Sequence, residues 1–312
     1  MIVDRVQRWR AGRDLYRPAG EVVDTSRLEI HVTDSDNDAK RFVVDNHYSR
    51  SYPAARFRFM LNERGGRLLG VAVFSHPTNA FSLAPLPGTP PEVLADLLAQ
   101  AQAARLAGDR KRLAEIEAKM KDPRVELGRF VLLNDDRVGA NAETWFLARC
   151  FEILRARGIE GVVSFSDPFP RSSAAGNVVF GGHVGTIYQA HNAVYLGRAR
   201  RDTVRLLPDG RTLHGRTIAK IRNGEQGWRY AVGQLAEIAG AVEPRTPLAA
   251  ARWLEDNLPD LVRKVRHPGN HKYVWAFDRR VRKRIVRELE DREDGPPAYP
   301  KLVDILALAR AA

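Results

Sequence analysis

Four neighbouring side chains that can donate, accept or carry protons follow a predicted helix: His47, Tyr48, Ser49 and Arg50. The helix is predicted for residues 36–46, because acidic residues in its first turn suit the positive end of the helix dipole. Histidine is the most frequent general acid or base near neutral pH, and tyrosine and serine can share its proton. The cluster therefore indicates a catalytic role; the alternative is that each side chain caps the helix or lies on the surface.

A glutamate and an arginine interrupt an otherwise apolar predicted strand, residues 125–133. Glu126 and Arg129 are costly to bury there unless they are paired or functional. Because side chains alternate along a strand, their odd separation predicts that they lie on opposite faces. Arg129 can then bind a phosphate or a carboxylate through two parallel hydrogen bonds. The alternative is a structural ion pair with a neighbouring strand.

Polar side chains also end the next buried strand, residues 161–165: Ser166 and Asp167. Open α/β sheets bind ligands outside the carboxyl ends of their strands, although Asp before proline is also a common turn residue. Further along, clustered glycines lead into a predicted short helix and allow the backbone to approach a ligand closely. His183 and Tyr188 of this segment are expected to reach the same cleft as Asp167.

The hydrophobic pattern predicts an α/β scaffold for these residues. Residues 125–133, 141–157 and 161–165 form a βαβ unit, whose two strands are parallel. The other predicted strands are residues 28–32, 58–62, 68–74 and 193–197, with a hairpin within 206–213. The other predicted helices are a pair within 92–120 split at Gly108, then 226–239, 247 to just before Pro259, and 279–289. The fold class is therefore α/β, with a mixed, partly parallel central sheet flanked by helices.

Composition narrows the class of protein. The chain has 312 residues, a formal net charge of +12 and one cysteine, Cys150. A single thiol excludes an internal disulfide and a cysteine-based zinc cage, and it is typical of a reducing cytoplasm. No stretch approaches the roughly 18 apolar residues of a membrane span, and the first residues lack the apolar core of a secretion signal.

The positive charge is concentrated in two segments. Residues 198–222 contain eight Lys or Arg against two Asp, and residues 263–287 contain ten against one. This concentration favours a face that binds nucleic acid phosphates over the alternative of generally charged helix surfaces. The residues expected to contact DNA are Arg200, Arg201, Arg211, Arg216, Lys264, Arg266, Lys272, Arg279, Arg280 and Lys283.

In their order along the chain, five motifs resemble those of the Mom family of phage DNA-modification proteins. They are residues 46–49 (NHYS), 126–130 (ELGRF), 166–168 (SDP), 182–190 (GHVGTIYQA) and 271–273 (HKY). The resemblance implies an N-acetyltransferase-like (GNAT-like) fold and conversion of the N6 amine of adenine in DNA to a carbamoylmethylated form. This change shields phage DNA from restriction. The helices within 92–120 and the first 27 residues have no counterpart in the family pattern.

The resemblance also implies roles for particular residues. The catalytic candidates are His47, Tyr48, Ser49, Arg129, Asp167 and Tyr188. Some members of the family need iron, for which the candidate ligands are His47, Tyr48, Asp167 and His183. The alternative is a hydrogen-bonded cluster without a metal.

The donor of the transferred group is left open, with acetyl-CoA as one candidate. N-acetyltransferase folds hold the cofactor pyrophosphate at a turn between a strand and a helix, which corresponds to residues 136–141 here. The residues expected to bind a cofactor are Arg137, Gly139, Ser166, His183 and Gly185.

These predictions define an organisation and a set of partners. Residues 28–215 are expected to form the catalytic core, with a helical insertion at 92–122. Residues 216–290 are expected to form a basic, mostly helical DNA-binding region, between terminal extensions at 1–27 and 291–312. Double-stranded DNA is the expected partner, with no membrane and with a homodimer left open, in the cytoplasm of a phage-infected or prophage-carrying bacterium. A CoA-dependent N-acyltransferase acting on a protein or small molecule, or a non-catalytic DNA-binding protein, fits part of the same pattern.

Overall fold

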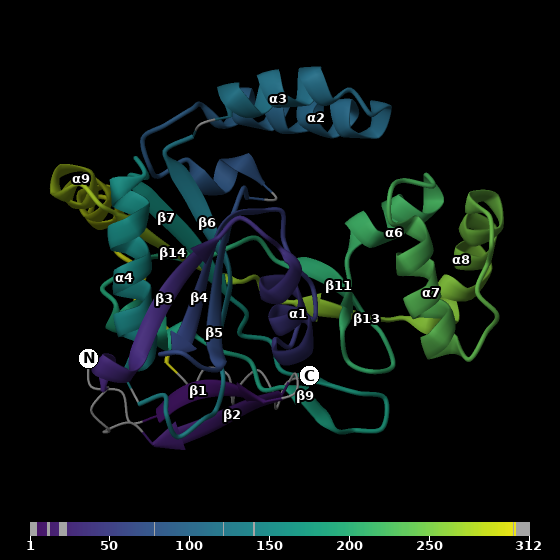
Figure 1. Ribbon diagram of the computed structural model, residues 1–312, viewed down its shortest axis with the longest axis horizontal. Helices are drawn as coiled ribbons and strands as arrows, with labels where there is room; N and C mark the ends of the chain where they lie inside the picture. Colours follow the sequence, from purple (N-terminus) through teal and green to yellow (C-terminus); the bar gives the residue numbers. More distant parts are fainter. Residues whose placement is uncertain are drawn as a thin grey trace.

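The computed structural model describes residues 5–10, 13–18, 24–77, 79–120, 122–139, 141–301 and 303. Its centre is a seven-stranded sheet in the order β10-β14-β7-β6-β5-β4-β3 (Figure 1). The strands are β3 (Leu28–Thr33), β4 (Ala55–Glu63), β5 (Leu68–Ser75), β6 (Arg124–Leu132), β7 (Gly161–Ser166), β10 (Val194–Arg198) and β14 (His271–Ala276). β6 and β7 pair in parallel, and the other neighbours pair antiparallel. The predicted α/β class with a mixed, partly parallel sheet is confirmed.

Helices cover both faces of this sheet. They are α1 (Asn37–Asn46), α4 (Ala142–Ala156), α5 (Thr186–Ala190) and α9 (Arg279–Glu290). α4 and α5 bury their apolar side chains against one face, and α1 and α9 pack on the other. In α4, the buried positions include those that the helical period predicts: Leu147, Cys150, Phe151 and Leu154. The βαβ unit β6–α4–β7 is confirmed.

The predicted helical pair is present between β5 and β6. It consists of α2 (Pro91–Ala107) and α3 (Arg110–Lys119), preceded by the short helix η2 (Ala80–Leu83). Gly108 ends α2 in the left-handed conformation (φ +69°), which favours glycine. Asp109 then caps α3 by accepting a hydrogen bond from the Arg112 amide. The pair has a small apolar core of its own, made mainly of Ala101, Ala104, Ile116 and Met120.

A second sheet and a helical unit follow β10. The sheet has the order β12-β11-β13 and contains β11 (Asp202–Leu206), β12 (Thr212–Leu213) and β13 (Arg263–His267). Between β12 and β13 the chain forms α6 (Gly215–Arg222), α7 (Trp228–Ala239) and α8 (Pro247–Leu261), which pack around their own core beside the central sheet (Figure 1). Thr246 caps α8 by accepting a hydrogen bond from the Ala249 amide. The predicted end of α8 before Pro259 is wrong, because a proline near the C-terminus of a helix removes only one late hydrogen bond.

Two strands that the sequence did not predict lie within the mostly helical residues 216–290. After α8 the chain forms β13, then returns to the central sheet as β14 between β10 and β7. Most of β14 is buried, including His271 and Tyr273. A strand covered on both faces lacks the alternation of apolar and polar residues by which strands are recognised in a sequence.

Smaller elements complete the fold. They are the hairpin β1 (Arg5–Arg10) and β2 (Arg13–Pro18), the short helix η1 (Thr25–Arg27), and the hairpin β8 (Arg171–Ser172) and β9 (Val178–Phe180). Among the described residues, no helix combines the length and the apolar composition that crossing a bilayer requires.

Candidate active site

A β-bulge in β6 places Glu126 and Arg129 on the same face of the sheet. The pairing of β5 with β6 skips Gly128, which is an extra residue in β6. A Cβ atom at Gly128 would lie 2.9 Å from Ser75 Oγ and 3.2 Å from Pro53 Cγ, so only glycine fits there. The prediction of opposite faces is therefore wrong, because a bulge reverses the alternation of side chains. The residues of β6 that face the α4 layer show the same reversal: Val125, Leu127, Phe130 and Leu132.

The candidate residues gather where β6 and β7 continue beyond their shared pairing. The last parallel pair is Leu127 with Ser164. Arg129 lies beyond this pair on β6, and Ser166 and Asp167 lie beyond it at the end of β7. This edge is formed by the carboxyl ends of parallel strands, where α/β proteins bind their ligands.

Asp167 is the centre of a buried hydrogen-bond network. Its Oδ1 accepts hydrogen bonds from His267 Nε2 (3.0 Å) and from the Phe169 amide (2.9 Å), and its Oδ2 pairs with Arg171. The Gly269 amide donates to His267 Nδ1, so Nδ1 acts as an acceptor and the ring proton lies on Nε2, facing Asp167. Burial raises the pKa of Asp167, but the Arg171 charge and the His267 hydrogen bond outweigh it and hold the pKa at about 2. Asp167 is therefore an anion near neutral pH and a poor proton acceptor.

Tyr48 lies in an aromatic cluster next to this network. Its ring stacks on Phe180 (centroids 3.8 Å apart) and on Trp9 (5.4 Å), and it contacts the ring of His47 (4.2 Å). The guanidinium of Arg171 lies over the rings of both Tyr48 and Phe180. Burial raises the pKa of the Tyr48 phenol, so the hydroxyl stays protonated.

Arg129 fixes the loop that follows α1. Its Nε donates to the Ser51 carbonyl (2.8 Å), its Nη2 to Ser51 Oγ (2.6 Å) and its Nη1 to the Gly128 carbonyl. In the same loop, His47 Nδ1 accepts a hydrogen bond from the Ser49 amide and lies 2.8 Å from Ser49 Oγ. Burial and the nearby Arg129 charge lower the pKa of His47, which is therefore neutral. Arg129 thus positions the predicted catalytic loop instead of presenting a free fork to a phosphate.

Glu126 is a buried carboxylate whose pKa lies near neutral pH. Burial raises the pKa of Glu126 to about 7, against the opposing charges of Arg129 and Lys272. Tyr188, from α5, interacts electrostatically with both Glu126 and Arg129 and hydrogen-bonds Ser164. A carboxylate of this kind can accept a proton near neutral pH.

The predicted cofactor residues His183, Ser166 and Gly185 also lie here. The His183 amide donates to the Asp167 carbonyl (2.8 Å), and burial lowers the pKa of the His183 ring to about 4. Ser166 is fully buried, and its Oγ has no hydrogen-bond partner among the described residues. Gly185 has a φ of +68°, and a Cβ atom there would lie 2.8 Å from the Tyr188 ring. Gly185 is thus required for close packing at the start of α5.

Tyr48 is the point at which the predicted catalytic residues meet. It interacts electrostatically with Asp167, Arg129 and Tyr188, and it touches His47. Residues that are up to 141 positions apart in the sequence therefore surround one site.

The side chains predicted to hold iron do not form a ligand set. Within the part of the chain that the structure describes, no group of three or more His, Cys, Asp or Glu side chains is arranged to hold a metal ion. Both carboxylate oxygens of Asp167 already bind His267 and Arg171. The Tyr48 hydroxyl is protonated here and would have to lose its proton to bind a metal ion. The residues present do not fit the metal that the resemblance implies.

Comparison with known proteins identifies the family. Residues 107–293, more than half of the chain, match the sequence model of the Mom protein family. This chain belongs to the Mom protein family. Membership supports a group-transfer enzyme that modifies DNA or carries out acyl transfer. A search of curated proteins found no match.

One solved structure found to be similar is that of the polyamine N-acetyltransferase of Drosophila melanogaster, an enzyme that catalyses the formation of N-acetylagmatine. The match has 12% sequence identity and covers 80% of this chain and 100% of the other. Its TM-score of 0.33 is too low for any conclusion about the reaction.

The turn between β6 and α4 of this Mom protein holds its own ion pair. Arg8, fully buried, donates to the Gly139 carbonyl (2.7 Å) and pairs with Glu143 in the first turn of α4 (2.5 Å). The side chain of the predicted cofactor residue Arg137 lies 3.5 Å from Glu63 and 3.9 Å from Asp135. None of these contacts joins Arg137 or Gly139 to the cluster around Tyr48.

The buried pair gives a stability prediction. Arg8→Met leaves the Glu143 carboxylate buried without its guanidinium, which costs about 3–5 kcal/mol in the free energy of unfolding. The double variant Arg8→Met/Glu143→Met should recover most of this loss, because an apolar pair leaves no buried charge. Urea denaturation followed by circular dichroism measures both. A loss below about 1 kcal/mol in the single variant would contradict the pairing.

The residues predicted to bind DNA fall into separate places. Arg200, Arg201, Lys264 and Arg266 are exposed on β13 and on the loop before β11. Arg211 pairs with Asp209, and Arg216 pairs with Glu225. Lys272 is half-buried in β14 near Glu126, which makes it a poor phosphate contact. Arg279, Arg280 and Lys283 are exposed on α9, across the central sheet from β11 and β13 (Figure 1).

Several site residues gave no recognisable signal in the sequence. Arg171 follows Asp167 by four positions, a spacing typical of a local turn. His267 lies 100 residues from Asp167, and Trp9 lies in a segment without a counterpart in the family pattern. His214, which precedes α6, is exposed and interacts electrostatically with Asp167. Trp9 and His267 are brought to the site by strands β1 and β13, so they could be assigned to it only from the structure.

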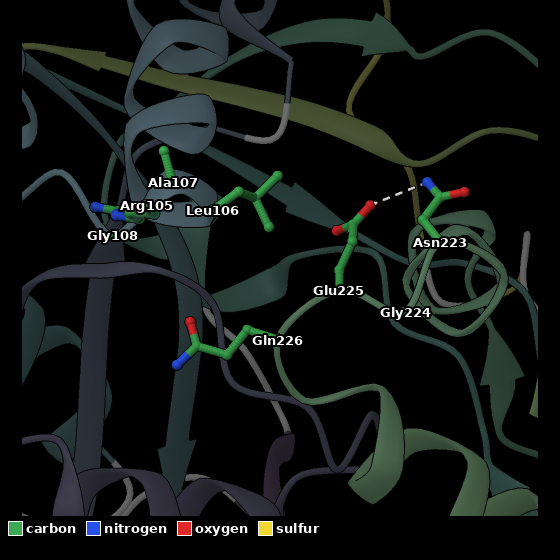
Figure 2. Close-up of a pocket in the computed structure, with 8 residues that line it drawn as sticks. All are labelled: Arg105, Leu106, Ala107, Gly108, Asn223, Gly224, Glu225 and Gln226. Atoms are coloured by element: carbon green, nitrogen blue, oxygen red, sulfur yellow. Dashed lines mark hydrogen bonds between the residues drawn. The ribbon is translucent and has the colours of Figure 1, made fainter. Parts of the chain in front are cut away.

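An open groove lies elsewhere in this Mom protein, between the end of α2 and the α6–α7 turn (Figure 2). Residues 105–108 and 223–226 line it. Asn223 Nδ2 donates to Glu225 there, and Glu225 also pairs with Arg216. The groove contains none of the predicted catalytic or cofactor-binding residues.

Proposed function

We propose that this protein modifies DNA by adding a carbamoylmethyl group to the N6 amine of adenine, which protects phage DNA from restriction. The observation that carries the proposal is the convergence of His47, Arg129, Asp167 and Tyr188 around Tyr48. These are the residues that family resemblance links to function. They surround one site at the carboxyl ends of β6 and β7, where an α/β enzyme binds its substrate.

The reaction requires activation of a weak nucleophile. The lone pair of the adenine amine is delocalised into the ring, so the amine is a weak nucleophile. A base must take one N6 proton as N6 bonds to the methylene carbon of the transferred group and the bond between that carbon and the rest of the donor breaks. Glu126 is suited to take this proton, because its pKa of about 7 makes it half ionised at neutral pH. Arg129 and the Tyr188 hydroxyl lie near it and can stabilise negative charge that develops in the transition state.

The adenine must leave the duplex to reach this site. Flipping the base costs roughly a few kcal/mol, which stacking on aromatic side chains can repay. Tyr48 is partly exposed, whereas the Trp9 and Phe180 rings that pack on it are buried, so Tyr48 is the candidate of this cluster for such stacking. His214, which is exposed and interacts electrostatically with Asp167, is a further side chain that an incoming base could contact.

We place the phosphate contacts on β13 and not on α9. Lys264 and Arg266 are exposed on the strand whose His267 contacts Asp167, so they lie close to the site. The double variant Lys264→Glu/Arg266→Glu should weaken binding to a duplex oligonucleotide at least tenfold at low salt. It should also reduce the slope of log Kd against log salt by about 2, as expected for two lost contacts. Fluorescence anisotropy at several salt concentrations measures both.

The matched control is Arg280→Glu/Lys283→Glu on α9, which makes the same change of charge on an element that supplies none of the partners of Asp167 among the described residues. It should change affinity less than about threefold through the long-range field alone. Equal losses in the two double variants would contradict a binding face centred on β13.

Nucleoside mass spectrometry tests the function itself. Plasmid DNA from cells that express the protein should contain an adenosine whose mass is increased by one carbamoylmethyl group, and DNA from cells with the empty vector should not. The mass identifies the transferred group. Unmodified DNA from cells with abundant soluble protein would count against base modification, provided that a known DNA methyltransferase is detected in the same assay.

A further inference from the structure

The turn from β6 to α4 is the place at which the sequence predicts the pyrophosphate of a CoA-type donor. Such a site needs free backbone amides and the positive end of a helix. Here two amides of the turn are bonded within the turn itself: the Arg137 amide donates to Asp135 Oδ1 (3.1 Å) and the Val138 amide to the Asp135 carbonyl (3.0 Å). The Ala142 amide donates to the Gly139 carbonyl (3.1 Å).

The N-terminus of α4 already has an anion of its own. Glu143 lies in the first turn of the helix and is 2% exposed, so its carboxylate occupies the position that the helix dipole favours for a phosphate. Arg8 neutralises it, with Nη2 at 3.1 Å from Glu143 Oε2 and at 2.7 Å from the Gly139 carbonyl. The turn thus presents a carbonyl and a carboxylate to an internal cation, where a pyrophosphate site would present amides to an anion.

The strand that supplies Arg8 also lines the active site. β1 pairs in parallel with the end of β6 through Trp9 and Leu133, and the Asn134 amide donates to the Trp9 carbonyl. The neighbouring side chains have different tasks. Arg8 is buried against α4, and the ring of Trp9 lies 5.1 Å from that of His47. One strand therefore closes the turn and completes the wall of the catalytic site.

The charges around the turn also disfavour binding of a pyrophosphate. Asp135, Asp136 and Glu143 lie within nine residues, against the single Arg137 of the turn and the buried Arg8. Arg137 itself lies beside the carboxylates of Asp135 and Glu63. A pyrophosphate at this turn would meet repulsion from carboxylates.

We propose that the donor of the transferred group is not a CoA thioester, and that the enzyme uses a donor without a nucleoside pyrophosphate. This inference rests on the proposed function for the identity of the reaction, but the closure of the turn by Arg8 and Glu143 is independent of it. Strand β1 pairs at the end of β6, where it supplies the Arg8 that neutralises Glu143.

Binding measurements on the full chain test the proposal directly. Isothermal titration with CoA, acetyl-CoA and inorganic pyrophosphate at 0.3 M salt should give no binding up to about 1 mM, while duplex DNA at low salt gives a clear signal from the same preparation. Micromolar binding of CoA that Arg137→Glu weakens tenfold or more would overturn the closure of the turn. Arg137 is exposed, so this variant is expected to fold.

An activity assay separates this inference from the proposed function. The protein is incubated with DNA and a desalted host extract, supplemented either with the low-mass fraction freed of CoA species or with CoA thioesters alone. Modified adenosine in the first reaction supports the proposal, and modified adenosine only in the second overturns it. Absence of modified adenosine with the complete extract would count against the proposed function, whereas the CoA titration still decides whether the turn is closed.

Discussion

Replacing Asp167 by Asn is expected to reduce formation of the modified nucleoside about 100-fold or more and to leave affinity for DNA within about twofold. Asn keeps the shape of the side chain and an acceptor for the Phe169 amide and His267. It loses the negative charge that holds Arg171 over the rings of Tyr48 and Phe180. A shift of a positioning group by about 1 Å is enough for a loss of this size. Single-turnover assays on duplex DNA measure the rate, and anisotropy measures the affinity.

Asp122→Asn is the matched control. Asp122 is fully buried and pairs with Arg124, but its network lies among the carbonyls of Leu83, Leu86 and Thr89, away from the site. Its loss should cost about 3–5 kcal/mol of stability, as expected for a broken buried pair, with full activity below the melting temperature. Equal loss of activity in both variants would mean that Asp167 acts through the fold alone. Full activity of Asp167→Asn would show that the reaction does not need the negative charge of Asp167.

The scaffold could be predicted because each of its elements carries a local signal. The hydrophobic period of α4 and the glycine that separates α2 from α3 each define an element within a few residues. β14 could not be predicted, since a strand buried on both faces has no alternation to detect. Its place between β10 and β7 depends on pairing across more than 70 residues of sequence.

The candidate site could be predicted in part for the same reason. Short motifs reveal side chains such as His47 and Asp167, but not the partners that position them. His267 reaches Asp167 through β13, after a helical unit of three helices. The bulge at Gly128, which reverses the faces of Glu126 and Arg129, follows from the register between two strands. Both depend on long-range packing that a motif does not contain.

Glu126→Gln is expected to remove most of the activity while it makes the protein more stable at high pH. As a general base, Glu126 should contribute about 10²- to 10⁴-fold to the rate, which Gln cannot supply. Wild-type activity should rise with pH up to about 7, because only the ionised carboxylate accepts a proton. The small residual activity of Glu126→Gln should lack this rise. Single-turnover rates between pH 5.5 and 8.5 measure both profiles.

The effect on stability has the opposite sign. Burial raises the pKa of Glu126 from 4.5 to about 7, so the folded protein binds the proton more tightly than the unfolded chain. This contribution to stability is fully present below pH 4.5 and is lost as the pH rises through about 7. The loss amounts to about 3 kcal/mol above pH 8, because one pKa unit corresponds to about 1.4 kcal/mol. Gln carries no charge at any pH and avoids this cost.

Urea denaturation at pH 5 and pH 8 therefore distinguishes a catalytic carboxylate from a structural one. The free energy of unfolding of Glu126→Gln, relative to that of wild type, should increase between pH 5 and pH 8 by most of the loss that wild type suffers. Glu152→Gln, a control at an exposed glutamate of α4, should show no such change. If Glu126 served mainly as an ion-pair partner of Arg129 and Lys272, its removal would destabilise the protein at pH 8. A buried carboxylate that costs stability at the pH of the reaction and is needed for the rate is what a general base in this site requires.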